Sequence, residues 1–109
     1  MNVVVKHHDL VVPIFSSSDT AAGVIFFIGD LPAVTLEPVK ANVVTGVAVG
    51  AVIEGPRETG SGWGQGTVVY WDTANQRFTT TATGNKRVGV VVGGDVLPSA
   101  TRALVLMDR

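Results

Sequence analysis

The sequence contains no cysteine, and only 16% of its 109 residues are charged. Without cysteine, the chain has no disulfide and no thiolate metal site. The net charge is −1, so there is no basic excess to neutralise phosphates, and we predict no nucleic-acid partner. The longest stretch of low polarity, residues 43–53, is shorter than the roughly 20 residues of a membrane-spanning helix. Residues 1–10 lack the basic start and long apolar core of a signal peptide, so we predict no membrane partner.

A recognisable catalytic or metal-binding pattern is also missing. His7 and His8 could belong to a metal site or a pH switch, but adjacent residues on a strand point to opposite faces, which favours a solvated polar step. Glu54, Glu58 and Asp72 could supply a carboxylate pair. The first two flank a proline and Arg57 in a glycine-rich loop, however, and acid–base catalysis needs rigid placement. We therefore predict no catalytic residue, no metal site and no enzyme activity.

The glycine cluster at residues 60–67 does not match a phosphate-binding loop, because no lysine follows its glycines and no helix is expected after it. We predict no cofactor. Trp63 lies in the middle of this flexible segment, where a large aromatic side chain usually covers something. Together with Tyr70 and Trp71 it could stack on sugars, so a surface-exposed module that binds glycans or a host is an alternative function.

The sequence is rich in strand-forming residues, with 21 Val, 4 Ile, 11 Thr, and 13 Gly for turns. Branched side chains are stiff at χ1 and pack well on a pleated surface. Short apolar runs separated by turn signals are typical of a barrel or sandwich. We predict one all-β domain over residues 1–109, a small β-barrel or sandwich, without any helix longer than about two turns.

The expected strands cover residues 10–15, 24–28, 34–37, 43–53, 67–71, 77–83, 88–92 and 103–107. The fully apolar run 24–28 suits a strand buried on both faces. Residues 3–5 are either a further strand or part of an extended N-terminal arm, residues 1–10, without a partner in the monomer. The polar step 6–9 would let that arm hinge.

Two turns are expected from local chemistry. Residues 73–76 form a hairpin connection, since Asn75 tolerates the left-handed region. Gly84 and Asn85 form a tight turn with positive φ at one of them, because glycine adopts that conformation without steric cost.

Mean hydropathy is +0.38, and a small domain has much surface for its volume. Some apolar area should therefore stay uncovered in one copy, and such patches mark partner surfaces. This predicts a homo-oligomer. Part of residues 43–53 or of the final strand should form the contact, and the subunit-contact candidates are Val47, Val49, Leu104 and Leu106.

The second half of the chain carries a recurring pattern. Gly66 precedes Val69-Tyr70-Trp71-Asp72, a threonine-rich strand ends in Thr83-Gly84-Asn85, and Val88-Gly89-Val90 and Ala103–Leu106 follow. In this pattern the chain resembles the small capsid cement, or head decoration, proteins of tailed phages. The resemblance covers the second half well and the whole chain loosely.

The resemblance implies a structural virion protein on the outer surface of the phage head, made in the host cytoplasm. Its partners would be the major capsid protein and further copies of itself, with a trimer favoured over a dimer because the family sits at local three-fold positions. The arm could add a strand to a capsid protein sheet. Capsid-contact candidates are Val3, Val4, Val5 and Lys6 in the arm, and Trp63 in the glycine-rich loop.

Overall fold

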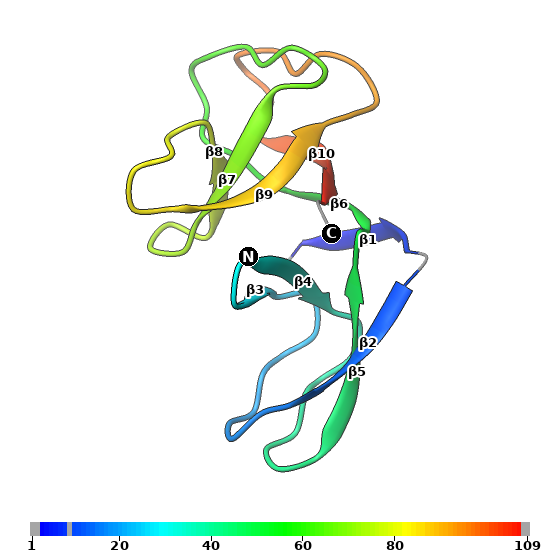
Figure 1. Ribbon diagram of the computed structural model, residues 1–109. Coiled ribbons are helices and arrows are strands. Elements are labelled where there is room, and N and C mark those ends of the chain that lie inside the picture. The colour runs from blue at the N-terminus through cyan, green and yellow to red at the C-terminus, as the bar shows by residue number, and fades with distance from the viewer. Residues whose placement is uncertain (1–2, 9, 108–109) are drawn as a thin grey trace.

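The computed structural model describes residues 3–8 and 10–107, which form ten strands in two antiparallel sheets (Figure 1). The six-stranded sheet contains, in spatial order, β1 (Val4–His7), β6 (Val52–Pro56), β10 (Arg102–Met107), β9 (Lys86–Val91), β7 (Val68–Asp72) and β8 (Arg77–Thr79). The four-stranded sheet contains β2 (Leu10–Phe15), β5 (Val44–Val49), β4 (Leu31–Thr35) and β3 (Ile25–Ile28). No helix occurs in the described residues, and so none that could span a membrane. The all-β prediction is confirmed, as two sheets rather than a closed barrel.

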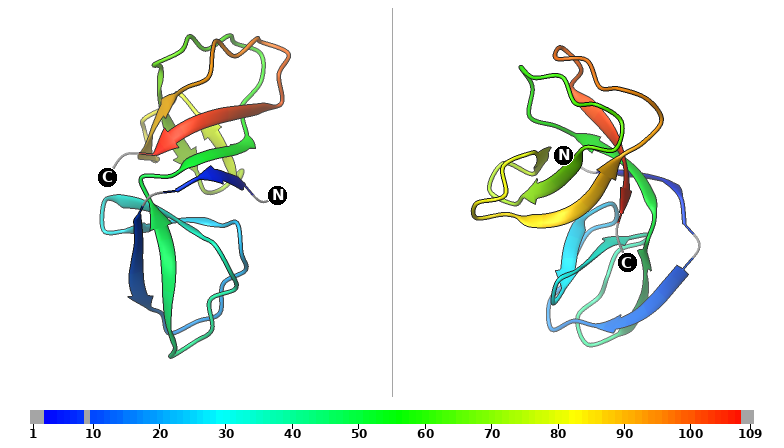
Figure 2. Two further views of the ribbon diagram at one scale, coloured as in Figure 1. Left: turned by 90° about the vertical axis from the view of Figure 1, so that its right-hand side faces the viewer. Right: turned by 45° about the horizontal axis from the view of Figure 1, so that its top comes forward.

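The two sheets occupy opposite ends of an elongated molecule that measures 41 × 27 × 21 Å. In the left view of Figure 2, β1, β6 and β10 run across the upper half, whereas β2 and β5 run along the lower half. The expected strand 43–53 is divided between the halves. β5 ends at Val49, Gly50 has a φ of +63°, and β6 begins at Val52. This positive φ, which glycine tolerates, lets the chain pass from one sheet to the other.

The six-stranded sheet curls until its last strand meets the continuation of β6. Arg57 forms a parallel bridge with Phe78, and the Glu58 amide donates to the Phe78 carbonyl at 2.8 Å. Phe78 is fully buried and meets Trp71 edge-to-face, with ring centroids 5.1 Å apart. Such an aromatic pair contributes about 0.5–1.5 kcal/mol beyond the buried area.

Two hydrophobic cores follow from this arrangement. The main core lies on the inner face of the curled six-stranded sheet. It extends to the place where the two sheets meet, through Ile25, Val34 and Ala48 of the four-stranded sheet. The second core lies on the opposite face of the four-stranded sheet and consists of Ala33, Val39, Val47 and Val49. Ala48 faces the main core while its neighbours face the second, so β5 is buried on both faces.

The N-terminal segment is a strand, not a free arm. β1 pairs antiparallel with β6, with Val4 opposite Glu54 and Val5 opposite Ile53. Val3 is only 4% exposed, and it lies over Gly55, where an added Cβ would come within 2.6 Å of the valine Cγ1. The expectation of an extended arm without a partner in the monomer is therefore corrected. The missing side chain of Gly55 makes the space into which Val3 packs.

A second correction concerns the apolar run 24–28. Its strand, β3, is an end strand of the four-stranded sheet and pairs only with β4. Ile25 is buried, but Ile28 is 40% exposed. The run is therefore not buried on both faces: only Ile25 of β3 is buried, and among the described strands β3 has β4 as its one neighbour.

The two expected turns are present. Asn85 donates its amide to Ala82 at 3.1 Å, and Gly84 has a φ of +77°, as a type II turn requires. In the 73–76 connection the positive φ falls on Gln76, at 53°, and not on Asn75. Asn75 instead donates its backbone and side-chain N–H groups to the Asp72 carboxylate.

Candidate interaction surfaces

The outer face of the six-stranded sheet carries an apolar row across four strands. Leu106 lies opposite both Val52 and Val90, and Val90 lies opposite Val68. The residues that alternate with them, such as Ile53 and Val105, are buried in the main core. Leu106 is 41% exposed and the other three are half-buried. These four side chains, here called the outer row, therefore point away from the core.

A second line of residues runs beside the outer row. Val4 and Leu104 lie on either side of Glu54 in the strand register, and Val4 is 47% exposed. The charge on this part of the face is paired, because Arg102 Nε donates to Glu54 Oε1 at 3.0 Å. A partner covering this face would meet apolar side chains and an ion pair that is already formed.

The predicted contact residues divide into two groups. Leu104, Leu106 and Val4 lie on the outer face, and Lys6 is exposed at a register irregularity of β1. The remaining candidates are covered within one chain. Exposed fractions are 0% for Val47, 2% for Val49 and 4% for Val3, while Val5 packs against the main core. Val47 and Val49 therefore offer no surface to a second copy, because the second core already occupies their side chains.

The upper end of the molecule consists of two long loops, residues 57–67 and 93–101, that bind each other. Trp63 forms an antiparallel bridge with Val96, with backbone bonds of 2.9 and 2.7 Å. The Gly60 amide donates to the Pro98 carbonyl at 3.0 Å, and the Gln65 amide donates to Asp95 Oδ1 at 2.9 Å. The glycine-rich segment is thus fixed by pairing with the second loop.

Arg57 holds this loop pair from inside. Its side chain is 4% exposed and donates to the carbonyl oxygens of Glu58, Ser61 and Leu97. Burial lowers the pKa of the guanidinium from its ordinary value, and the charge of Glu58 acts in the opposite direction. Arginine stays protonated in proteins, so the buried charge is held by carbonyl dipoles and by the ring of Trp63.

The aromatic side chains do not form a sugar-stacking platform. Trp63 is 4% exposed beneath Arg57, and Trp71 is 3% exposed in the main core. Only Tyr70 of the three is half-exposed. Trp63 does not offer a direct contact to a capsid either, because its indole is buried under the two upper loops.

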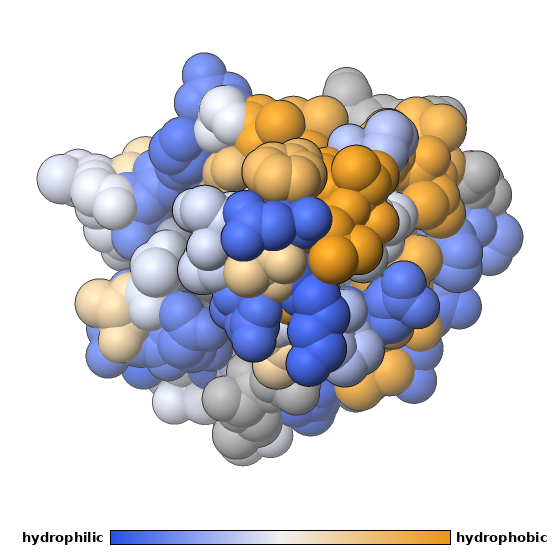
Figure 3. Space-filling view, turned by 90° about the horizontal axis from the view of Figure 1, so that it is seen from below, coloured by the Kyte–Doolittle hydropathy of each residue, from blue (hydrophilic) through white to orange (hydrophobic). Residues whose placement is uncertain are grey.

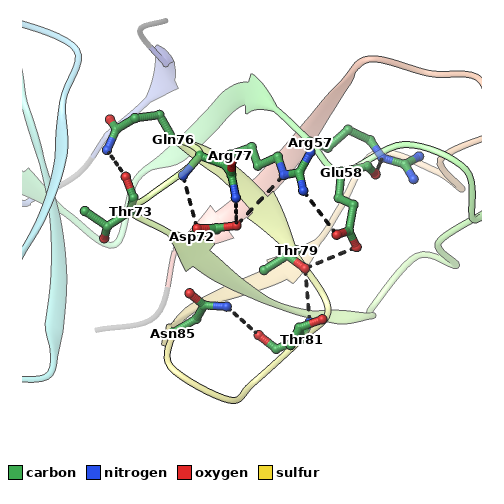
Figure 4. Close-up of polar contacts among 10 residues, drawn as sticks. Arg57, Glu58, Asp72, Thr73, Gln76, Arg77, Thr79, Thr81 and Asn85 are labelled. Carbon is green, nitrogen blue, oxygen red and sulfur yellow. Dashed lines mark hydrogen bonds and ion pairs between the residues drawn. The ribbon is translucent and has the colours of Figure 1, made fainter.

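A polar cluster lies where β8 meets the start of the loop (Figure 4). Arg77 donates to Glu58 Oε2 at 3.4 Å, and Thr79 donates to Glu58 Oε1 at 3.3 Å. The hydrogen bonds from Asn75 lower the pKa of Asp72, and Arg77 contributes in the same direction. Within residues 3–8 and 10–107, no three His, Cys, Asp or Glu side chains gather to hold a metal ion. His7 and His8 fall in this range, whereas residue 9 lies outside it.

The described surfaces offer exposed apolar side chains next to charges that are already paired. A family model described as phage cement protein matches residues 4–106. The chain belongs to the phage cement protein family. No curated protein and no solved structure matches it. The family match agrees with the sequence resemblance and gives this cement protein a structural role in the phage.

The sequence did not indicate two features of this cement protein. Arg57 carries no signal in the sequence, because a lone arginine in a glycine-rich segment is normally solvated. Phe15 is 65% exposed at the end of β2, beside Val44, which is also 65% exposed and lies opposite it. Pro13, two residues before Phe15, was a usable signal, since proline within strands is confined to sheet edges and bulges.

Proposed function

We propose that this protein binds the outer surface of an assembled phage head through the major capsid protein and stabilises the shell without catalysis. It would be made in the host cytoplasm and become part of the virion. One observation carries the proposal: a single copy leaves large apolar side chains exposed on both sheets, among them Leu106 at 41% and Phe15 at 65%. Apolar surface of this kind marks sites where a partner binds.

We assign the outer row to contacts between copies, in a homotrimer. The row lies on the outer face of a sheet that is well supported by the main core, so its position does not depend on a loop. Oligomerisation also supports attachment. Copies joined to one another bind a repeating shell with an avidity that exceeds the affinity of one copy.

The proposal is tested with heads assembled without this protein. Purified protein is mixed with these heads, the heads are sedimented, and the bound protein is measured against free protein. We expect saturable binding, together with a higher temperature or chelator concentration for head disruption. Heads from an unrelated phage serve as the control. Absence of binding to its own heads would overturn the proposal.

A further inference from the structure

A groove lies in the lower half of the molecule, at the opposite end from the upper loops. It encloses about 550 Å³. Its two walls are Pro13, Ile14 and Phe15 of β2 and Phe26, Phe27 and Ile28 of β3. β2 and β3 are the two end strands of the four-stranded sheet. The groove therefore lies where this sheet has curled round without closing.

The walls show how the groove runs relative to the strands. Successive side chains of a strand point to opposite faces. Three consecutive residues of one strand can line the same cavity only if the cavity follows the edge of that strand. Both walls consist of three consecutive residues. The groove is thus bounded by two strand edges, which are templates for an added strand.

The two edges differ in what they offer. The Thr35 amide donates to the Val24 carbonyl at 3.1 Å, and this bond continues the β3–β4 ladder by one residue pair. The direction of the backbone hydrogen-bonding groups alternates along an antiparallel strand. The backbone N–H and C=O of Phe26 and Ile28 therefore point toward β4, whereas those of Phe27 point to the open edge of β3. In β2, Pro13 has no N–H to donate. β3 is therefore the better edge for pairing.

The side chains around the groove specify an uncharged occupant. None of the residues that line it is charged. Its rims carry Phe15, 65% exposed, and Ile28, 40% exposed, while Val39 of the second core reaches its floor. Thr35, also on the floor, already donates to Ala21 and accepts from Val24. Seen from below, apolar residues gather on one side of this end of the molecule, next to hydrophilic residues that cover much of the rest (Figure 3). A charged side chain placed here would lose water without gaining a partner.

We propose that an extended, uncharged segment of the capsid protein adds as a strand beside β3 and places apolar side chains between Phe15 and Ile28. This inference rests on the proposed function and names the contact that performs it. Addition of a strand to an exposed sheet edge is an established mode of peptide recognition. The capsid protein is the fitting occupant because the chain belongs to the phage cement protein family, and because a groove lined without charged residues suits an uncharged segment. In this arrangement the outer row contacts other copies of the protein, and the groove binds the capsid protein.

The first test introduces charge at the rims. Phe15→Lys and Ile28→Lys alter exposed side chains and should leave the fold intact, which thermal melting verifies. Leu97→Lys is the matched control, because Leu97 is 68% exposed on the upper loop. Each rim variant should bind heads about tenfold more weakly or worse, the effect of an unpaired charge at an apolar contact, whereas the control should bind as the unaltered protein does.

The second measurement uses the unaltered chain, so it does not depend on any variant folding. Hydrogen exchange is compared for free and head-bound protein. Slowed exchange in the peptide that contains Phe27, with no change around Leu97, supports strand addition. If the unaltered protein binds but the rim variants bind equally well, or exchange at Phe27 is unchanged, the groove assignment is wrong and the proposed function stands. If the unaltered protein does not bind the heads of its own phage, the groove assignment and the proposed function are both wrong.

Discussion

The guanidinium carbon of Arg57 lies 4.1 Å from the centre of the Trp63 ring. Arg57 begins the loop 57–67 and Trp63 stands at its middle, so this contact folds the loop back on itself. The same guanidinium donates to Leu97 at 2.8 Å and so reaches the second loop. A desolvated cation–π contact is worth about 2 kcal/mol. A single buried arginine thus orders a segment that composition alone describes as flexible.

Replacing Arg57 with methionine should lower the free energy of unfolding by about 3 kcal/mol. The substitution keeps the length of the side chain but leaves three carbonyl oxygens without their donor, and such losses cost about 1–3 kcal/mol each, partly offset by water. Urea unfolding followed by tryptophan fluorescence measures the change. Lys40→Met, on an exposed side chain, is the control and should have little effect. Equal stability of the two variants would contradict the assigned role of Arg57.

Val3→Ala should destabilise the protein by about 2 kcal/mol, the scale expected for removing buried methyl groups next to a rigid backbone. Val3 packs over Gly55 and is 4% exposed. Val4→Ala, at a position that is 47% exposed, should change stability by less than about 0.5 kcal/mol. Chemical denaturation of both variants makes the comparison. If the two behave alike, the residue that precedes β1 does not contribute to the core.

The sequence predicts a strand near Val3, but it does not predict what the strand packs against. A short valine run predicts a strand, and the register of β1 confirms that part. Whether Val3 packs within one copy depended on Gly55, 52 positions later, which no local pattern reveals. The same holds for residues 43–53: alternation was visible, but the division at Gly50 between two sheets follows from tertiary packing.

Gly84→Val should cost roughly 1–3 kcal/mol, because a β-branched residue is strained at a positive φ. No atom lies within 4 Å of an added Cβ, so any loss reports backbone conformation and not crowding. Gly84→Asn should cost less, since asparagine tolerates this region. The melting temperatures of the two variants decide the point. An unchanged melting point for Gly84→Val would refute the turn.

Asp72 should contribute to stability in a pH-dependent manner. Its pKa in the folded protein is lowered by hydrogen bonds from Asn75 below the ordinary 3.8. The unfolded chain then binds the proton first, so the contribution is complete above the ordinary value and is lost as pH falls through the lowered one. Asp72→Asn should therefore flatten the acid side of the stability curve, measured by urea unfolding between about pH 2 and 6. Glu37→Gln, on an exposed side chain, is the control.

The candidate contacts were predictable only in part. Leu104 and Leu106 alternate with buried Val105, so both lie on one face of the final strand. Val47 and Val49 show the same alternation, yet they face the second core, because β5 is covered on both sides. Alternation gives the faces of a strand but does not say which face remains open. Only the position of the strand in its sheet supplies that information.

Leu106→Glu should convert the protein to monomers without unfolding it. Leu106 is 41% exposed and lies at the centre of the outer row, between Val52 and Val90. Its charge would be solvated in a single copy, whereas in a covered contact it would be desolvated without a partner. Light scattering should give the monomer mass of 11.3 kDa for Leu106→Glu, a threefold mass for the unaltered protein, and the same threefold mass for Leu97→Glu, the control on the upper loop. The unaltered protein at the monomer mass at micromolar concentration would contradict the trimer. A Leu106→Glu trimer would instead place the contact elsewhere, because the outer row cannot bury a carboxylate at its centre and remain closed.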